Sequence, residues 1–540
     1  DRALQIAVIG SGITGAAAAY TIAENARANS SYEYPPEITI FEQNPIIGGR
    51  LTTARVFNQS ELTIDTCAAT FSALLDTCLQ DLALNVGLTT RIVTPLNGGQ
   101  AVWDGDKIIG IPEDDGFRDS EAWSIAKTAR WYNSYGDVLQ NFTADRITLE
   151  QKFLTFGGLS SPFTSLRQEV NNSDLLMDVA SPPCNPFGKP SDAPDWCFRD
   201  KSEEWVNEVV EAGLRERFFG GFRQNNGLAT ALALSSERIL RSIDGGNLRL
   251  IDRLVKLSGA ELLLNTKVEN ITQIKLQEGY QHTLFFSMPT TGIAKRDFDT
   301  VIVASPIAFA NLTYLPLIRD RPQRLPVPRI PYTYTTVIHF TTTSTLNSER
   351  FNTSSPAPGI ILTSDSRNFN NRNPTDIPFL SLRLLDTNIR PINSTTGQPN
   401  PIYPAQNLYK IISYNNLTDA ELLSFLDDKT NQNPSITWIN REYLPQSVPQ
   451  MYRTPEVEDG VQGDIEIAPS LYYAGGGGGQ VVDTVEIGCR MGRNVGRLVV
   501  SERGAAPRPG NGFLSEDEEE SVMLQGDEEE LKRLMLEMSY

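Results

Sequence analysis

The stretch Ala3-Leu4-Gln5-Ile6-Ala7-Val8-Ile9-Gly10-Ser11-Gly12-Ile13-Thr14-Gly15 decides the fold of this chain. Its residues are mostly apolar up to Ile9, which is typical of a parallel strand that is covered on both faces. The three glycines that follow have G-x-G-x-x-G spacing. Gly10 allows a tight turn, Gly12 lets the backbone approach a pyrophosphate, and Gly15 permits close packing of a helix on the strand. The sequence therefore predicts a dinucleotide-binding turn with a helix N-terminus facing phosphate charge.

Residues 3–60 complete a βαβ unit around this turn. An alanine-rich helix is expected from Ile13 to about Ala28, and a second strand covers Glu37–Glu42. Glu42 lies at the end of that strand, where a carboxylate can accept hydrogen bonds from both hydroxyls of an adenosine ribose. We expect the neighbouring Gln43 to contact the same cofactor.

A Gly-Gly-Arg-Leu extension at residues 48–51 narrows the predicted cofactor to FAD. Glycines let the chain pass close to a cofactor, and the forked guanidinium of Arg50 suits the pyrophosphate or the flavin. This extension is typical of FAD enzymes of the glutathione-reductase/amine-oxidase type rather than of NAD dehydrogenases. The alternative interpretation is a surface arginine after an ordinary turn.

Two later segments also favour FAD. In Asn265–Glu269, the backbone of Val268 is expected to hold the adenine. Near the C-terminus, a strand at Leu471–Ala474 ends in a run of glycines. The next helix is expected at Asp483–Val500, so that its N-terminal dipole points at the flavin ring or the ribityl chain.

The sequence identifies cofactor contacts but no catalytic residue. The expected FAD-binding residues are Gly10, Gly12, Ile13, Thr14, Gly15, Glu42, Gln43, Gly49, Arg50, Leu51, Ala68, Ala69, Val268, Gly475, Thr484 and Val485.

The order of elements predicts an α/β fold. A discontinuous Rossmann-like FAD-binding domain of the glutathione-reductase/amine-oxidase type is interrupted by an inserted α+β substrate domain. The FAD-binding domain takes residues 1–65, 240–310 and 466–503, and the substrate domain takes 66–239 as a helical part and 311–465 as a β-rich part. Expected elements of the substrate domain are helices at 71–85, 120–140, 146–156, 163–170, 203–217 and 418–426, and strands at 332–340, 359–363, 379–385 and 436–441.

Charge and composition exclude several classes of function. The formal net charge is −19, whereas nucleic-acid binding needs a positive face. The sequence contains no block of 18 or more apolar residues, so no transmembrane helix is predicted. With only His282 and His339 in the chain, a histidine-based metal site is not expected. Residues 504–540 form an acidic tail that is expected to be disordered. The helical spacing of Leu531, Leu534, Met535 and Met538 leaves open a weak contact of this tail with a partner protein.

Several features favour the secretory pathway, with an extracellular or vacuolar/lysosomal destination. The chain starts at Asp1, as after removal of a signal peptide, although a cloning boundary would explain this equally. Asn-x-Ser/Thr sequons occur at Asn29, Asn58, Asn141, Asn171, Asn270, Asn311, Asn352, Asn393 and Asn416. Cys184 and Cys197 flank a loop rich in Pro, Gly and Asp, which favours a disulfide between them over two free thiols.

From residue 4 to about 500 the chain resembles the prenylcysteine oxidase (prenylcysteine lyase) family. The segments that carry the resemblance are Ile6–Gly15, Phe41-Glu42, Gly48–Leu51, Asp244–Asn247, Asp299–Pro306, Tyr334–Val337 and Tyr472–Gly496. The resemblance implies oxidation of the thioether of farnesyl- or geranylgeranyl-cysteine with O2. The carbon attached to sulfur gives hydride to the flavin, water adds, and cysteine, a prenyl aldehyde and H2O2 result. Such chemistry needs orientation in a dry apolar pocket more than a strong acid–base pair.

The chain departs from the family after the Gly-Gly-Arg extension. Where relatives carry a Gly-Gly/Ala-Ser-type segment along the flavin, this sequence reads Asp65-Thr66-Cys67-Ala68-Ala69-Thr70. Cys67 is either a ligand contact, a covalent flavin attachment or an inert small residue, and buried cysteine usually packs as a small hydrophobe. His339, in a β-like run, is interpreted as a core or surface residue rather than a catalyst.

Two alternatives to the thioether oxidase stay open. One is an FAD oxidase of another apolar substrate, such as an amine or a secondary metabolite. The other is a non-catalytic flavin- or lipid-binding protein. Oxidation of farnesylcysteine under air separates these three classes.

Overall fold

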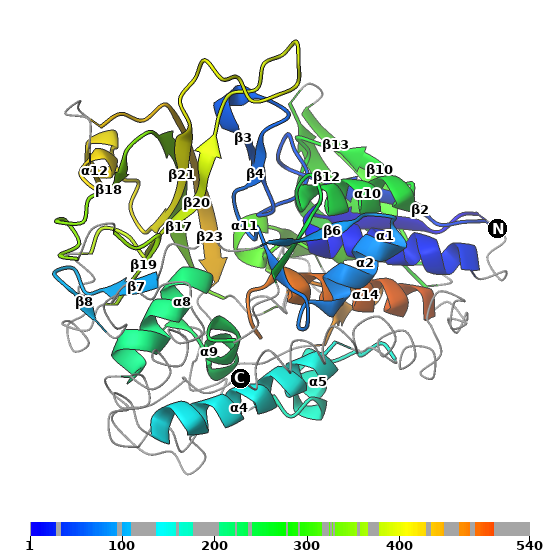
Figure 1. Cartoon of the computed structure of the whole chain (residues 1–540). Coiled ribbons are helices and arrows are strands. Elements are labelled where there is room, and N and C mark those ends of the chain that lie inside the picture. The colour runs from blue at the N-terminus through cyan, green and yellow to red at the C-terminus, as the bar shows by residue number, and fades with distance from the viewer. Residues whose placement is uncertain are drawn as a thin grey trace.

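The structure is a computed structural model (Figure 1). It describes residues 2–28, 34–93, 100–109, 137–157, 161–175, 205–221, 224–235, 240–276, 279–289, 292–315, 323–324, 327, 330–353, 357–364, 377–427, 434–447, 464–475 and 481–501. The acidic tail, Cys184, Cys197 and most of the helix expected at 120–140 lie outside these residues.

A six-stranded sheet forms the centre of the nucleotide-binding half. Its order is β10 (Glu261–Leu263), β2 (Glu37–Phe41), β1 (Gln5–Ile9), β14 (Thr300–Val303), β25 (Leu471–Tyr473) and β24 (Glu466–Ala468). All pairs are parallel except β24 with β25. Three stretches of sequence that lie far apart therefore build one sheet, as the discontinuous domain predicted. The domain boundaries themselves stay a prediction.

Side chains alternate between the two faces of this sheet. Ile6 and Val8 face three helices, α1 (Ile13–Ala28), α10 (Leu248–Ser258) and α14 (Val485–Ser501). Ala7 and Ile9 face a five-stranded sheet, whose order is β13 (Gly292–Phe298), β12 (Tyr280–Met288), β11 (Lys267–Lys275), β15 (Thr313–Leu315) and β16 (Gln323–Arg324). Burial on both faces explains the almost unbroken apolar run of β1.

A seven-stranded sheet forms the second half, on the left of Figure 1. Its order is β23 (Trp438–Ser447), β17 (Tyr332–Thr342), β21 (Gln406–Ser413), β20 (Ser381–Ile389), β19 (Ile360–Thr363), β7 (Gln100–Trp103) and β8 (Ile108–Ile109). One of its faces carries an aromatic core around the fully buried Trp103. The other face turns toward the nucleotide-binding half.

Two expectations about residues 66–239 need correction. This part is not purely helical, because β7 and β8 lie within it, and β7 pairs with β19, more than 250 residues later. The helix expected at 71–85 begins only at Thr77, as α2 (Thr77–Asn85), because Phe71-Ser72 forms strand β5 and pairs with Leu240-Arg241. The spacing of apolar residues within one segment does not indicate which distant strand that segment pairs with.

The remaining elements are short. Small sheets pair β3 (Thr53–Arg55) with β4 (Thr63–Asp65), β18 (Thr345–Leu346) with β22 (Leu426–Asp427), and β9 (Leu240–Ile243) with both β5 (Phe71–Ser72) and β6 (Thr90–Val93). Further helices are α4 (Asp137–Thr155), α5 (Leu166–Asn172), α8 (Glu211–Arg217), α9 (Gly227–Ala233), α11 (Ile307–Ala310) and α12 (Asp419–Leu423), with a 3₁₀ turn at Val56–Asn58 and a π-helical turn at Val206–Val210. Thr418 and Glu421 form the predicted capping box of α12.

Helix α14 packs on α1 through a stripe of glycines at 488, 492 and 496. A Cβ at Gly492 would lie 2.3 Å from the carbonyl oxygen of Thr14, and one at Gly496 would lie 2.9 Å from that of Ala18. The residues of α1 that face these glycines include Thr14, Ala17 and Ala18, whose side chains are small, so the two backbones can approach closely. This close approach sets where the N-terminus of α14 lies.

A buried ion pair holds α14 to the segments on its other side. Glu486 accepts hydrogen bonds from the backbone N–H groups of Cys78 and Leu79, at the start of α2. It also accepts from Arg490, at 2.6 Å. Arg490 in turn donates to backbone carbonyls that include that of Phe153 in α4. Because both charges are satisfied by several partners, their burial is tolerated.

A disulfide joins Cys78 of α2 to Cys489 of α14, across a sequence separation of 411 residues. The sequence analysis missed it, because nothing local to either cysteine indicates so distant a partner. The predicted Cys184–Cys197 disulfide lies outside the described residues. Cys67 is a free thiol.

Two observations bear on the cellular environment. Of the predicted glycosylation sites, Asn58, Asn171, Asn270, Asn311, Asn352 and Asn416 are exposed. Among the described helices, none has both the length and the apolar character required to cross a membrane. Secretion and glycosylation stay predictions.

We expect Gly492→Ala to destabilise the protein. The added methyl group would meet the backbone of α1, and such overpacking costs about 1–3 kcal/mol. Replacing glycine by alanine within a helix by itself raises the free energy of unfolding by up to about 1 kcal/mol, so the net loss of stability is smaller. Urea unfolding of both proteins measures the difference.

Arg493→Ala on the same helix serves as the control. Arg493 is ion-paired with Asp81 at 3.3 Å, and a partly exposed pair of this kind contributes about 1 kcal/mol at most. A Gly492→Ala protein as stable as the wild type would show that the glycine stripe does not set the spacing of the helices.

Candidate functional site

A cavity of about 1300 Å³ lies between the two halves of the protein. It begins at the carboxyl ends of β1, β2 and β14, which is where open parallel sheets bind their ligands. It extends to the face of the seven-stranded sheet opposite the aromatic core. Of the sixteen expected cofactor-binding residues, those that line it are Gly10, Gly12, Ile13, Thr14, Glu42, Gln43, Gly49, Arg50, Leu51, Ala68, Ala69, Val268, Gly475, Thr484 and Val485.

Gly15 is not among the lining residues, because it has the packing role that its position in the motif predicted. A Cβ there would lie 2.0 Å from the carbonyl oxygen of Gly10, so that only glycine lets α1 start this close to β1. Gly10 itself has a φ of 106°, which glycine adopts readily. The turn therefore presents the first N–H groups of α1, which have no partner within the helix, to the cavity.

Glu42 lies at the end of β2 and is almost fully buried. One of its oxygens accepts from the backbone N–H and the hydroxyl of Ser11, at 3.0 and 2.7 Å. The other accepts from the backbone and the side chain of Asn44, both at 2.9 Å. These bonds fix the carboxylate at the cavity wall, where a carboxylate can receive the hydroxyl groups of a ribose.

Arg50 forms a two-pronged ion pair with Asp483, with N–O distances of 2.7 and 2.6 Å. The Asp483 side chain is 4% exposed and that of Arg50 is 36% exposed. Burial alone would raise the pKa of Asp483, but the guanidinium outweighs this effect and lowers it. The pair joins the Gly-Gly-Arg segment to the residue that precedes Thr484 at the start of α14. The predicted direct contact of Arg50 with the cofactor stays a prediction.

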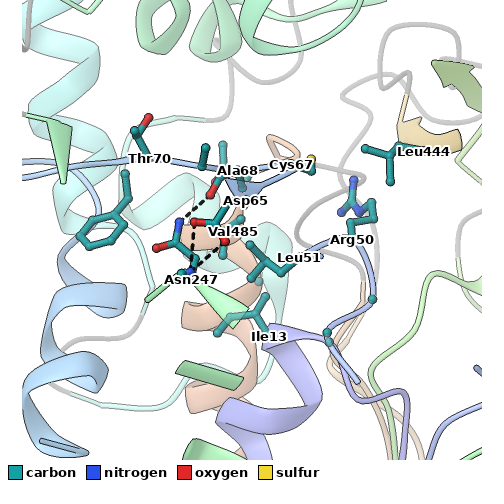
Figure 2. A pocket seen from close by; sticks show the side chains of 18 of the residues that line it. Ile13, Arg50, Leu51, Asp65, Cys67, Ala68, Thr70, Asn247, Leu444 and Val485 are labelled. Carbon is teal, nitrogen blue, oxygen red and sulfur yellow. Dashed lines mark hydrogen bonds between the residues drawn. The ribbon is translucent and has the colours of Figure 1, made fainter. Parts of the chain in front are cut away.

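Asp65 and Asn247 form a second polar link in the cavity wall (Figure 2). Both oxygens of Asp65 accept from the backbone N–H of Asn247, at 3.0 and 3.1 Å. The Asn247 side chain donates to the carbonyl of Ala68, at 2.6 Å. Burial raises the pKa of Asp65 to about 6, although the Asn247 hydrogen bond opposes this shift. The link holds residues 65–68 against the start of α10.

Cys67 lies on the same segment, beside Arg50 and Leu444 (Figure 2). It packs with an apolar group that includes Leu444, Ile412 and Phe219. Burial raises the pKa of its thiol, although Lys410 and Arg50 oppose this shift. A neutral, packed thiol suits the interpretation of Cys67 as a small hydrophobe, and the absence or presence of a covalent flavin bond stays open to experiment.

The far part of the cavity is mostly apolar. Phe218, Phe219, Ile412 and Leu444 line it, and all four are buried. Another wall is aromatic, where Phe309, Tyr332, Tyr334 and Tyr443 line the cavity and Tyr334 stacks on Tyr443 with ring centres 4.9 Å apart. Such a surface suits a large hydrocarbon ligand.

One buried hydroxyl group in the near part of the cavity is available to form a hydrogen bond with a ligand. The hydroxyl oxygen of Ser305 is buried and has no hydrogen-bond partner within the described residues. It lies against Gly10 and Gly475, both of which line the cavity. By contrast, the described residues contain no cluster of His, Cys, Asp or Glu that could hold a metal ion.

Four further residues line the cavity although none was predicted as a site residue, namely Asp65, Asp483, Lys410 and Arg383. Two of them had a signal in the sequence, because Asp65 begins the segment expected along the flavin and Asp483 begins the expected C-terminal helix. Both histidines are fully buried. Burial lowers the pKa of His339 well below its usual value. It is not among the residues that line the cavity.

Comparisons with known proteins agree with this arrangement. A family model described as prenylcysteine lyase matches residues 198–506, and a model for an NAD(P)-binding Rossmann-like domain matches residues 8–83. A farnesylcysteine lyase from Arabidopsis thaliana is 23% identical over 349 residues, which cover 63% of this chain and 64% of the relative. The match thus spans slightly less than two thirds of the relative's own length.

Two solved structures share the fold. A cyclohexylamine oxidase from Brevibacterium oxydans IH-35A superposes with a TM-score of 0.52 and 13% identity, covering 93% of this chain and all of that one. A fatty acid isomerase from P. acnes that produces CLA superposes with a TM-score of 0.50 and 12% identity, covering 93% of this chain and 99% of that one. These likenesses show the α/β architecture alone.

Asp65 gives a prediction about the pH dependence of stability. The folded protein keeps the Asp65 proton up to about pH 6, whereas an ordinary aspartate, with a pKa of 3.8, releases it earlier. The free energy of unfolding should therefore fall as the pH rises from about 4 to about 6, and this part of the fall should be absent in Asp65→Asn. Urea unfolding at a series of pH values measures the difference between the two proteins.

Asp106→Asn, at an exposed turn between β7 and β8, is the control for removing an aspartate. If the difference between wild type and Asp65→Asn did not change between pH 4 and 6, the raised pKa of Asp65 would be refuted.

Proposed function

Because this chain belongs to the prenylcysteine lyase family, we propose that it is an FAD-dependent oxidase that cleaves prenylcysteine-like thioethers. The proposed products are cysteine, a prenyl aldehyde and H2O2. The observation that carries the proposal is the continuous cavity, which joins the glycine turn and Glu42 to an apolar chamber. A cofactor and a hydrocarbon substrate could meet within it.

The residues of the near part fit FAD. The N-terminus of α1 and the glycines at 10, 12 and 49 suit a pyrophosphate, and Glu42 suits the adenosine ribose. Val268 supplies backbone for the adenine, and the start of α14 at Thr484 and Val485 suits the flavin. Ser305 adds a buried hydroxyl that has no hydrogen-bond partner in the described part of the chain. FAD would supply a two-electron acceptor that O2 can reoxidise.

The reaction balances with one O2 and one water. The allylic carbon, which lies between the double bond and sulfur, loses hydride, water adds to that carbon, and the carbon–sulfur bond breaks. One thioether, O2 and H2O thus give one aldehyde, one thiol and H2O2. Sulfur and the allylic double bond stabilise the developing cation, so the protein needs no strong base.

The chain's own contribution is orientation. The apolar residues Phe218, Phe219, Ile412 and Leu444 would hold the prenyl chain and exclude water around it. Residues 65–69, fixed by the Asp65–Asn247 link, would form the wall beside the reacting carbon. Placing the reacting groups in one geometry can supply a large part of a rate enhancement.

We expect Arg50→Lys to weaken flavin binding. Lysine cannot replace the two parallel hydrogen bonds to Asp483, so the start of α14 would lose its link to the Gly-Gly-Arg segment. Loss of a charge-assisted bond at this point should raise the flavin dissociation constant roughly ten- to hundredfold. Fluorescence of the flavin released on dilution measures it.

Arg55→Lys is the matched control, since Arg55 is exposed on β3 only five residues away. Equal flavin retention in Arg50→Lys and wild type would argue against a role for this ion pair in holding the cofactor. Acid extraction and chromatography of the released flavin distinguish FAD from FMN.

The proposed function is tested by incubating the yellow protein with farnesylcysteine under air. Farnesal, free cysteine and peroxide should appear in equal amounts. S-Dodecylcysteine, which has a saturated chain, is the matched substrate control. It should react far more slowly, because its reacting carbon is not allylic.

Two other outcomes would contradict the proposal. Peroxide formed with amines but not with farnesylcysteine would indicate an oxidase of another apolar substrate. A flavin that no candidate substrate reduces would indicate a binding protein.

A further inference from the structure

Lys410 lies in the wall of the cavity and has no partner among the residues that the structure describes. It lies on β21 and lines the cavity, and within the described residues it makes no hydrogen bond or ion pair. Burial lowers the pKa of its ammonium group and Arg383 lowers it further, whereas Cys67, Glu216 and Asp65 oppose this shift. Taking an unpaired charge out of water is costly unless a ligand compensates it.

The neighbouring strand supplies a second cation. Arg383 of β20 is the register partner of Lys410, so the two side chains lie on the same face of the sheet, and Arg383 also lines the cavity. Arg383 forms an ion pair with Glu216 of α8, so the Glu216 carboxylate already has a cationic partner. Within the described residues, Lys410 is therefore the member of this pair that has no ion-pair partner.

Lys410 lies close to the segment that is predicted to line the flavin. Among the charged and ionisable groups close enough to influence it are Cys67 and Asp65, on the segment predicted to line the flavin. Ile412, two residues along the same strand, is on the same face and belongs to the apolar group around Cys67. Lys410 thus lies between the predicted flavin wall and the apolar chamber.

We propose that Lys410 binds the α-carboxylate of the substrate's cysteine and so selects free prenylcysteine over its carboxyl ester. This inference rests on the proposed function. In a prenylcysteine the carboxylate carbon is four bonds from the carbon that loses hydride. The site that binds the carboxylate must therefore lie close to the flavin in the cavity. An ester removes the negative charge, and with it the partner of Lys410.

The test compares farnesylcysteine with farnesylcysteine methyl ester in wild type, Lys410→Met and Lys410→Arg. Methionine keeps most of the length of lysine without its charge, and arginine keeps the charge. In Lys410→Met, KM for the acid should rise roughly ten- to hundredfold while kcat and the KM for the ester change little. Lys410→Arg should retain a preference for the acid. Lys256→Met, at an exposed position of α10, is the control for removing a lysine.

A binding measurement provides a readout that does not depend on turnover. Calorimetric titration with S-octylcysteine and its methyl ester should show the same loss of preference for the acid in Lys410→Met. A variant that weakens acid and ester equally would assign Lys410 a structural role, and a variant that changes neither would also overturn the inference. If the wild type binds the acid through Lys410 but oxidises no thioether, the proposed reaction fails while the binding role of Lys410 stands.

Discussion

The position of α14 is the constraint on which the cofactor site depends. Glycines at 488, 492 and 496 let the helix lie against the backbone of α1, and the buried Glu486–Arg490 pair ties its other side to α2 and α4. The Cys78–Cys489 disulfide adds a covalent link at the same place. Because the two sides leave the helix no freedom to shift, its N-terminus is held at the edge of the cavity, where residues 483–485 meet the Gly-Gly-Arg segment.

The electrostatics of the cavity follow from which charges are compensated. Glu42 accepts four hydrogen bonds, and Asp483 is neutralised by the fork of Arg50, so both carboxylates are tolerated near the predicted cofactor. Within the described residues, Asp65 accepts only from the backbone N–H of Asn247, and burial raises its pKa to about 6. Lys410 has no partner within the described part of the chain. The far part of the cavity combines an apolar group around Phe219, Ile412 and Leu444 with polar residues of the seven-stranded sheet, among them Lys410, Arg383 and Asp386.

Most of the cofactor wall could be predicted from the sequence, because its signals are local. The spacing of Gly10, Gly12 and Gly15 and the carboxylate at the end of β2 depend on backbone geometry within about forty residues. The substrate wall had no such signal. Lys410 becomes relevant only because β21 faces the segment that contains Cys67. At the cofactor end, the Arg50–Asp483 pair could not be predicted either, because the two residues are 433 positions apart. The strand β7 was missed for the same reason, since its partner β19 lies far along the chain.

The sequence by itself determined the strand–turn–helix unit, its suitability for a dinucleotide and the family of the chain, because glycine spacing and an unbroken apolar strand restrict the local backbone to few conformations. The pairing of Arg50 with Asp483 and the disulfide between Cys78 and Cys489 follow from the tertiary structure alone. The tertiary structure also places Lys410 in the cavity wall, where it has no partner within the described residues. These outcomes depend on how distant segments pack in three dimensions, and no local pattern of residues encodes that packing.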